Sequence, residues 1–326
     1  MNDHDRNPAM ARRRVLLQGL ALATASLAGC GGGGGDSGGG TPTPPPPPPA
    51  PPASGKLVYR NSGVAAVYDL ASRTELQFDP GVEPSLDPGV AVSRAGVVTV
   101  AREGDNTAFR FATYGLNGVL ITPYRVPRDF AFQLSAVLFN ADSTRIAVAV
   151  DEPTSSTNNT RIAKTLVYSW PAGLVLAEIP FMDEPVWAGT NGEFVARDER
   201  TSRLHLFSAA FADLGTPGNL VVPETVGAYN VSPDGRYIVW EDANLLRAYD
   251  RNTGQTWVAA EDATSDLHSP VISPDGNWVA VHARNLLNFA PHVFRFAPGL
   301  KVTVDSTLHA LNVGLADTAG RMGWAS

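Results

Sequence analysis

Pairs of acidic residues recur along the chain and are the residue type best suited to chemistry. Carboxylates attract basic segments and cations, and suitably spaced pairs can also bind calcium or act in glycosidases. Because the sequence does not give the distance between them, we assign no catalytic residue. We predict instead a binding face for a cationic partner. Its candidate residues are Asp151, Glu152, Asp198, Glu199, Glu241, Asp242, Glu261 and Asp262.

Histidines near the C-terminal end could bind a borderline metal such as zinc or manganese. Their spacing matches no recognised ligand motif, so we predict no metal and no other cofactor. The weak metal candidates are His268, His282, His292 and His309. The chain has no G-x-S-x-G nucleophile turn, and its longest glycine run precedes prolines instead of following a strand, as a phosphate-binding loop would.

The only cysteine, Cys30, ends the stretch Leu27-Ala28-Gly29-Cys30. A single cysteine excludes an intrachain disulfide. The stretch resembles a bacterial lipobox, in which the cysteine thiolate receives a diacylglyceryl group and becomes the first mature residue. The resemblance implies an exported, lipid-anchored protein. Gly31 stands where an aspartate would favour the inner membrane, so the outer membrane is expected.

An export signal precedes this cysteine. Three arginines at positions 12–14 are followed by a mildly apolar run at 15–28, which is too short for a transmembrane helix of about 20 residues. Arg12-Arg13-Arg14-Val15-Leu16 resembles the twin-arginine pattern, although Leu17 replaces the usual lysine. We therefore predict a lipoprotein signal peptide at 1–29 in which Arg12 and Arg13 direct Tat export. Sec export is the alternative.

Glycine and then proline dominate residues 31–54. A glycine-rich coil followed by polyproline II spans roughly 50 Å. We predict that 30–54 are the lipidated cysteine and a disordered tether, which holds the folded domain away from the lipid surface.

Residues 55–326 are predicted to be a single repeat domain. The S-P-D-G sequence occurs at 232–235 and at 273–276, and a β-rich run follows each copy. A degenerate copy lies at 316–324. Weaker copies begin at Ser93, Ala141 and Gly189. A period of about 40–48 residues with several short strands is typical of a β-propeller.

A second turn, Y-D-x-x-T-G at 249–254, follows the first S-P-D-G copy. The two turns together resemble the WD-like repeats of TolB-type propellers. We therefore predict an all-β, six-bladed propeller with five whole blades and one blade shared by the two ends of the chain; seven blades is the alternative. The count places an inner strand at 308–315 and second-position strands at both 55–60 and 321–325. One of these two is surplus, so either the first or the last strand should pair unusually. Propellers host unrelated activities, so the resemblance implies a fold and not a function.

The acidic residues should share one face of this propeller. If the strands of a blade are lettered A to D from the inside out, the tight A–B and C–D turns lie on one face. The longer B–C and D–A loops lie on the other, and these carry the acidic pairs. A solvated rim that serves only solubility is the alternative reading of this face.

The net charge of −7 argues against a nucleic-acid ligand. We expect a non-enzymatic protein-binding or scaffolding lipoprotein of the cell envelope, on the periplasmic side of the outer membrane. Its partner would be an unknown envelope protein with a basic contact surface. The alternative is a propeller enzyme that acts on carbohydrates or lactones with a divalent cation.

Overall fold

The computed structural model describes residues 55–61, 64–78, 90–92, 97–103, 108–127, 133–140, 142, 144–153, 161–170, 172–189, 191–220, 228–285, 288–305, 309–311 and 322–325. All of them belong to one compact unit, Pro47–Ser326. The predicted signal peptide and tether, 1–54, lie outside the described residues. Within the described part of the chain, no helix is long and apolar enough to cross a membrane.

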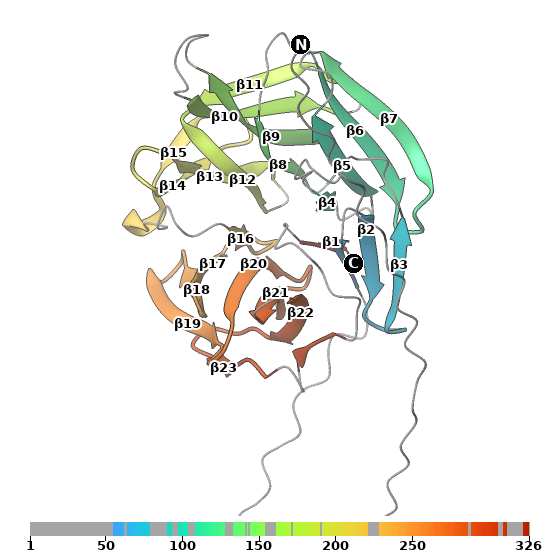
Figure 1. The fold of residues 1–326 in the computed structure, drawn as a ribbon. Helices are drawn as coiled ribbons and strands as arrows, with labels where there is room; N and C mark the ends of the chain where they lie inside the picture. The colour runs from blue at the N-terminus through green and yellow to red at the C-terminus, as the bar shows by residue number, and fades with distance from the viewer. Residues whose placement is uncertain are drawn as a thin grey trace, which may run out of the picture. The chain divides into compact units, whose positions relative to one another are not determined.

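Five blades are built from strands that are consecutive in the sequence (Figure 1). Blade 1 comprises β4 (Val90–Val92), β5 (Val97–Glu103), β6 (Ala108–Gly115) and β7 (Leu120–Pro127). Blade 2 comprises β8 (Gln133–Phe139), β9 (Arg145–Pro153), β10 (Arg161–Ser169) and β11 (Val175–Pro180). Blade 3 comprises β12 (Met182–Ala188), β13 (Glu193–Asp198), β14 (Arg203–Phe207) and β15 (Asp213–Gly215), and the 3-10 turn η1 (Pro217–Asn219) follows it. Blade 4 comprises β16 (Tyr229–Val231), β17 (Tyr237–Asp242), β18 (Leu245–Asp250) and β19 (Gln255–Glu261). Blade 5 comprises β20 (Asp266–Ile272), β21 (Trp278–Asn285) and β22 (Asn288–Arg295).

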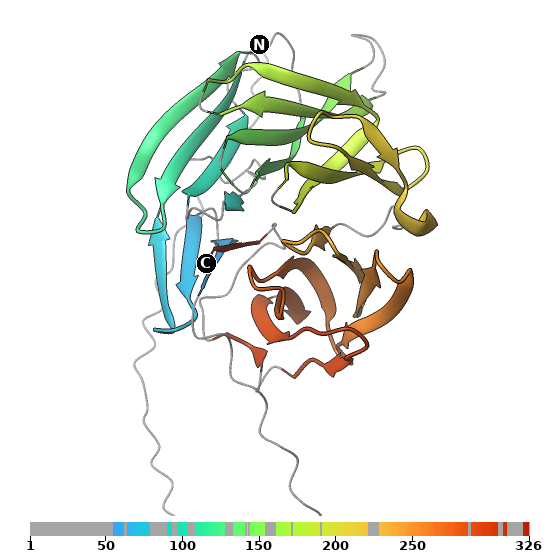
Figure 2. The ribbon, with the colours of Figure 1, turned by 180° about the vertical axis from the view of Figure 1, so that it is seen from behind.

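A sixth sheet joins the two ends of the domain. Its strands are β1 (Lys56–Asn61), β2 (Val64–Asp69), β3 (Thr74–Phe78) and β24 (Gly323–Ala325), in the order β24-β1-β2-β3. Strand β24 pairs antiparallel with β1, with Leu57 opposite Trp324. In Figure 2 the dark red β24 lies beside the blue β1. We call this the closing sheet.

The innermost strands of the sheets contact one another in cyclic order: β24, β4, β8, β12, β16, β20 and again β24. This closed order confirms the predicted all-β propeller. The structure has five blades of consecutive strands, whereas the prediction was a propeller of six or seven blades. The sheet shared by the two ends of the domain was predicted, and it is the closing sheet that completes the ring.

The outer edge of blade 5 differs from the predicted four-stranded blade at 268–305. Strand β23 (Val302–Thr303) pairs in parallel with β19, and so covers the edge of blade 4. Residues 309–311 lie beside β22, where Ala310 bridges His292 and the Leu311 amide donates to the Pro291 carbonyl (2.8 Å). The predicted inner strand at 308–315 is therefore wrong for these three residues.

The inner position of the closing sheet belongs instead to the last strand, β24, which is one of the two strands that the count left as possibly surplus. A Cβ atom on Gly323 would lie 2.6 Å from Cβ of Val92 in β4, so only glycine permits this approach. The side chains of Trp324 and Met322 are buried with Leu57 and Tyr59.

The repeated turns form as the sequence predicts. Gly235 adopts φ +75°, and its amide donates to the carbonyl of Ser232 (2.8 Å), while the Asp234 carboxylate accepts from the amide of Arg236 (3.0 Å). Glycine takes this left-handed geometry at little steric cost. The core lies between neighbouring sheets; for example, Val195 and Leu204 of blade 3 pack with Ile238 of blade 4.

Candidate binding site between blades 3 and 4

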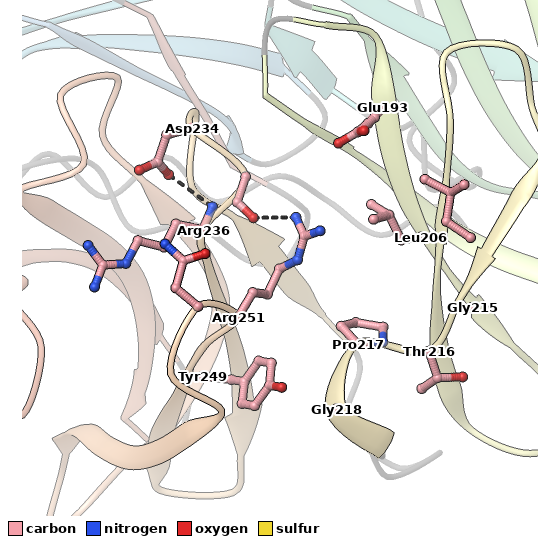
Figure 3. Close-up of a pocket in the computed structure, with 13 residues that line it drawn as sticks. Glu193, Leu206, Gly215, Thr216, Pro217, Gly218, Asp234, Arg236, Tyr249 and Arg251 are labelled. Carbon is pink, nitrogen blue, oxygen red and sulfur yellow. Dashed lines mark hydrogen bonds between the residues drawn. The ribbon is translucent and has the colours of Figure 1, made fainter.

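A pocket of about 690 Å³ opens between blades 3 and 4 (Figure 3). Blade 3 contributes Glu193, Leu206 and the segment 214–218, whereas blade 4 contributes the A–B turn at 234–236 and the residues around 249–252. Apart from 216–218, which begin the connection from blade 3 to blade 4, these are the tight turns and the strand ends next to them. The pocket therefore lies on the face opposite the predicted acidic one.

The wall from blade 4 is held by charged hydrogen bonds. Arg236 forms a two-point pair with Asp250, with Nε to Oδ1 at 3.1 Å and Nη2 to Oδ2 at 2.7 Å. These hydrogen bonds lower the pKa of Asp250 to about 2, so the pair is ionised at neutral pH. Arg251 donates from Nη1 to the carbonyl of Gly235, which fixes its guanidinium against the A–B turn.

The wall from blade 3 approaches Tyr249 so closely that one position must be glycine. A Cβ atom on Gly218 would overlap the Tyr249 hydroxyl group, and Gly218 has φ +58°. A side chain there would meet both a steric clash and an unfavourable backbone conformation. Gly218 thus sets how near η1 lies to blade 4.

The pocket is lined by a repeated position at which blade 3 differs from its neighbours. In blades 2 to 5, the residue paired with the start of the A–B turn is Arg145, Glu193, Tyr237 and Trp278, respectively. We call these the junction residues. Arg145 donates from Nη1 to the Ala209 carbonyl of blade 3 (2.8 Å) and lies over the Phe211 ring.

The two later junction residues also reach the next sheet. The ring of Tyr237 packs edge-on against Phe296 of blade 5, with 5.5 Å between centroids. Trp278 packs against the cluster that contains Tyr68 and Leu70 of the closing sheet. Among the described residues, the Glu193 carboxylate forms no hydrogen bond or ion pair. The junction that Glu193 occupies is therefore left open.

Opposite charges face each other across this opening. Figure 3 shows Glu193 on one wall and Arg251 on the other. Arg236 is neutralised by Asp250, whereas within the described chain the Arg251 side chain makes one hydrogen bond, to a backbone carbonyl. Such a pocket can bind a ligand that offers a cation to Glu193 and an acceptor to Arg251.

The acidic side chains of the predicted face that the structure describes form hydrogen bonds or ion pairs with other groups of the protein. Asp198, Glu241 and Asp262 are 3%, 7% and 6% exposed. Glu241 accepts hydrogen bonds from the amides of Ala228 (3.0 Å) and Ser269 (3.1 Å) and from Nδ1 of His268 (3.2 Å). It therefore joins the inner strands of blades 4 and 5, which is a structural role because buried carboxylates require donors.

The other buried acids support their own loops. Asp198 accepts from the amide of Arg200 (2.9 Å) and pairs with its guanidinium, whose hydrogen bonds lower the pKa of Asp198. Asp262 accepts from the amides of Thr264 (2.8 Å) and Ser265 (3.1 Å).

The less buried acids also have partners. Glu199 accepts from the amide of Ala163 in blade 2 (3.0 Å). Asp242 pairs with Arg247, and Glu261 pairs with Lys301 (2.7 Å). The side chains of Asp151 and Glu152 lie outside the description, although their backbones belong to β9. Docking of a basic partner on this face stays a prediction.

The four histidines do not meet at one point. His268 and His282 lie opposite each other on β20 and β21, and burial together with the neighbouring His268 and His292 lowers the pKa of His282 to about 3. Nδ1 of His309 accepts from the amide of Asp305 (2.9 Å). Over the described ranges, no group of three or more His, Cys, Asp or Glu side chains is placed to hold a metal ion. Cys30, Arg12 and Arg13 lie outside these ranges.

Comparison with known proteins identifies the class of fold. No family model and no curated protein matches the chain. Among solved structures 1146 chains match, so the fold is a common one. It is a TolB-like β-propeller. The crystal structure of TolB from Acinetobacter baumannii matches with a TM-score of 0.56 and 14% sequence identity over 83% of this chain and 66% of the TolB chain. At this identity the likeness shows the fold alone.

Proposed function

We propose that this chain is an exported lipoprotein of the cell envelope whose propeller binds a partner protein and catalyses no reaction. Cys30 would carry the lipid, and Arg12 and Arg13 would direct export, so that the domain lies on the periplasmic side of the outer membrane. The propeller suits this role because it presents short loops from several blades on a rigid scaffold.

The open junction at Glu193 carries the proposal. Its volume lies within the range of about 300–1,000 Å³ that is usual for ligand sites. Polar and charged groups line it, and Leu214 beside it is 54% exposed. Because the neighbouring junctions are filled by side chains of this chain, we expect a side chain from another polypeptide to fill this one.

Site-specific photo-crosslinking in cells tests the proposal. A photoreactive amino acid replaces Leu214 in the full lipoprotein, and the adduct is identified by mass spectrometry. The control is the same replacement at Leu174, an exposed leucine beside β11 of blade 2. We expect a discrete protein adduct from position 214 that position 174 does not give. Identical adducts from both positions, or none from position 214, would contradict a binding role for the pocket.

A further inference from the structure

The junction between blades 2 and 3 shows how the chain itself fills such an opening. Arg145 extends from the start of β9, lays its guanidinium over the Phe211 ring at 5.3 Å and donates to the Ala209 carbonyl at 2.8 Å. Arginine is suited to this contact because its stem is apolar and its planar head donates several hydrogen bonds. Glu193 holds the same register position in blade 3 and reverses the charge.

The charge balance of the pocket favours a cation on the side of Glu193. Arg236 is paired with Asp250, and the Asp234 carboxylate accepts from the hydroxyl of Ser232 and the amide of Arg236. Two carboxylates, Glu193 and Asp234, then remain against one guanidinium, that of Arg251. Leu206 and Leu214 supply apolar surface for the stem of a long side chain.

From this geometry we infer that the pocket receives an arginine or lysine side chain from the partner polypeptide. The incoming cation pairs with Glu193, while Arg251 donates to a carbonyl or carboxylate oxygen of the same segment. Both bonds are charge-assisted and therefore contribute more than neutral hydrogen bonds. The inference rests on the proposed protein-binding function and adds the chemistry of the group that is recognised.

Selection from a random heptapeptide phage library tests the inference. The immobilised full chain and its Glu193→Gln variant are compared, with Glu178→Gln as the control. Glu178 is an exposed acid on β11 of blade 2, where it pairs with Lys164 outside the pocket. We expect one arginine or lysine position to be enriched on the wild type and on the control, and the enrichment to be absent on Glu193→Gln.

A selected peptide then gives the size of the effect. Replacing its basic residue by citrulline, a neutral isostere of arginine, or by norleucine for lysine, should weaken binding about tenfold in fluorescence anisotropy. Glu193→Gln should weaken binding of the basic peptide by a similar factor and leave the neutral peptide unchanged. Leu214→Arg, which narrows the pocket, should weaken both peptides.

The outcomes separate the inference from the function that it rests on. Peptides without a basic preference that still lose binding in Leu214→Arg would overturn the inference and leave the pocket as a binding site. A basic preference that persists unchanged in Glu193→Gln would also overturn it. Selection of no peptide that depends on the pocket would count against both.

Discussion

Glu241 should be far more important for stability than its sequence neighbour Asp242. Glu241→Ala removes the hydrogen-bond acceptor of two backbone amides, those of Ala228 and Ser269. Both residues are buried, with 6% and 4% of their surface exposed. An unsatisfied buried amide costs about 1–3 kcal/mol, so the two together should lower the free energy of unfolding by about 2–6 kcal/mol. For a domain of this size, each kcal/mol corresponds to a Tm shift of about 2–4 °C.

Asp242 offers a matched comparison in the same acidic pair. Its side chain is 38% exposed and pairs with Arg247, which is also 38% exposed. Asp242→Ala should therefore cost about 0–1 kcal/mol. Urea unfolding of the full chain, followed by tryptophan fluorescence and with Cys30→Ser in every variant, measures both changes. A cost of Glu241→Ala no larger than that of Asp242→Ala would refute the role of Glu241 in joining blades 4 and 5.

Three further predictions concern other parts of the chain. Gly218→Ala should lower the free energy of unfolding by about 2–4 kcal/mol, because it adds a clash with Tyr249 to the strain of a positive φ. Gly254 is the control, since it has φ +73° and open space around it. Gly254→Ala should lower the free energy of unfolding by only about 1–2 kcal/mol in the same assay. The His282 pKa is lowered in the folded state, so the unfolded chain binds the proton first and stability should fall as the pH drops from about 6.5 toward 3. The slope of unfolding free energy against pH should be smaller by up to about 1.4 kcal/mol per pH unit in His282→Gln; an unchanged slope would show that other groups dominate. Cys30→Ser should move the protein from the membrane to the soluble fraction, and retention in the membrane would argue against lipid attachment at Cys30.

The sequence predicts the propeller well because its turns have strong local chemistry. The S-P-D-G turns and the glycine at 254 impose hairpins whatever lies around them, and their spacing gives the blades. The inner strand of the closing sheet was predicted at 308–315 instead of 323–325, because the repeat copy at 321–325 is short and degenerate. Its position depends on Gly323 approaching Val92, a contact between residues at opposite ends of the domain.

The burial of the acidic residues could not be predicted from their positions in the sequence. Glu241 and Asp242 are chemically similar neighbours, yet one is buried between blades and the other is exposed. That difference is set by β20 of the next blade. The pocket, in contrast, could have been predicted from the sequence. Aligning the repeats places Glu193 at the same position as Arg145, Tyr237 and Trp278. A lone acid among large side chains at that position indicates an open junction.

The closing sheet also bears on how the chain is made. Its innermost strand, β24, consists of residues 323–325, whereas its other three strands come from residues 56–78. During synthesis the edge of β1 that pairs with β24 therefore stays exposed until residues 323–325 have been translated. A product that ends before residue 323 would lack β24 and leave the ring of sheets open, which makes such truncated products targets for quality-control proteases.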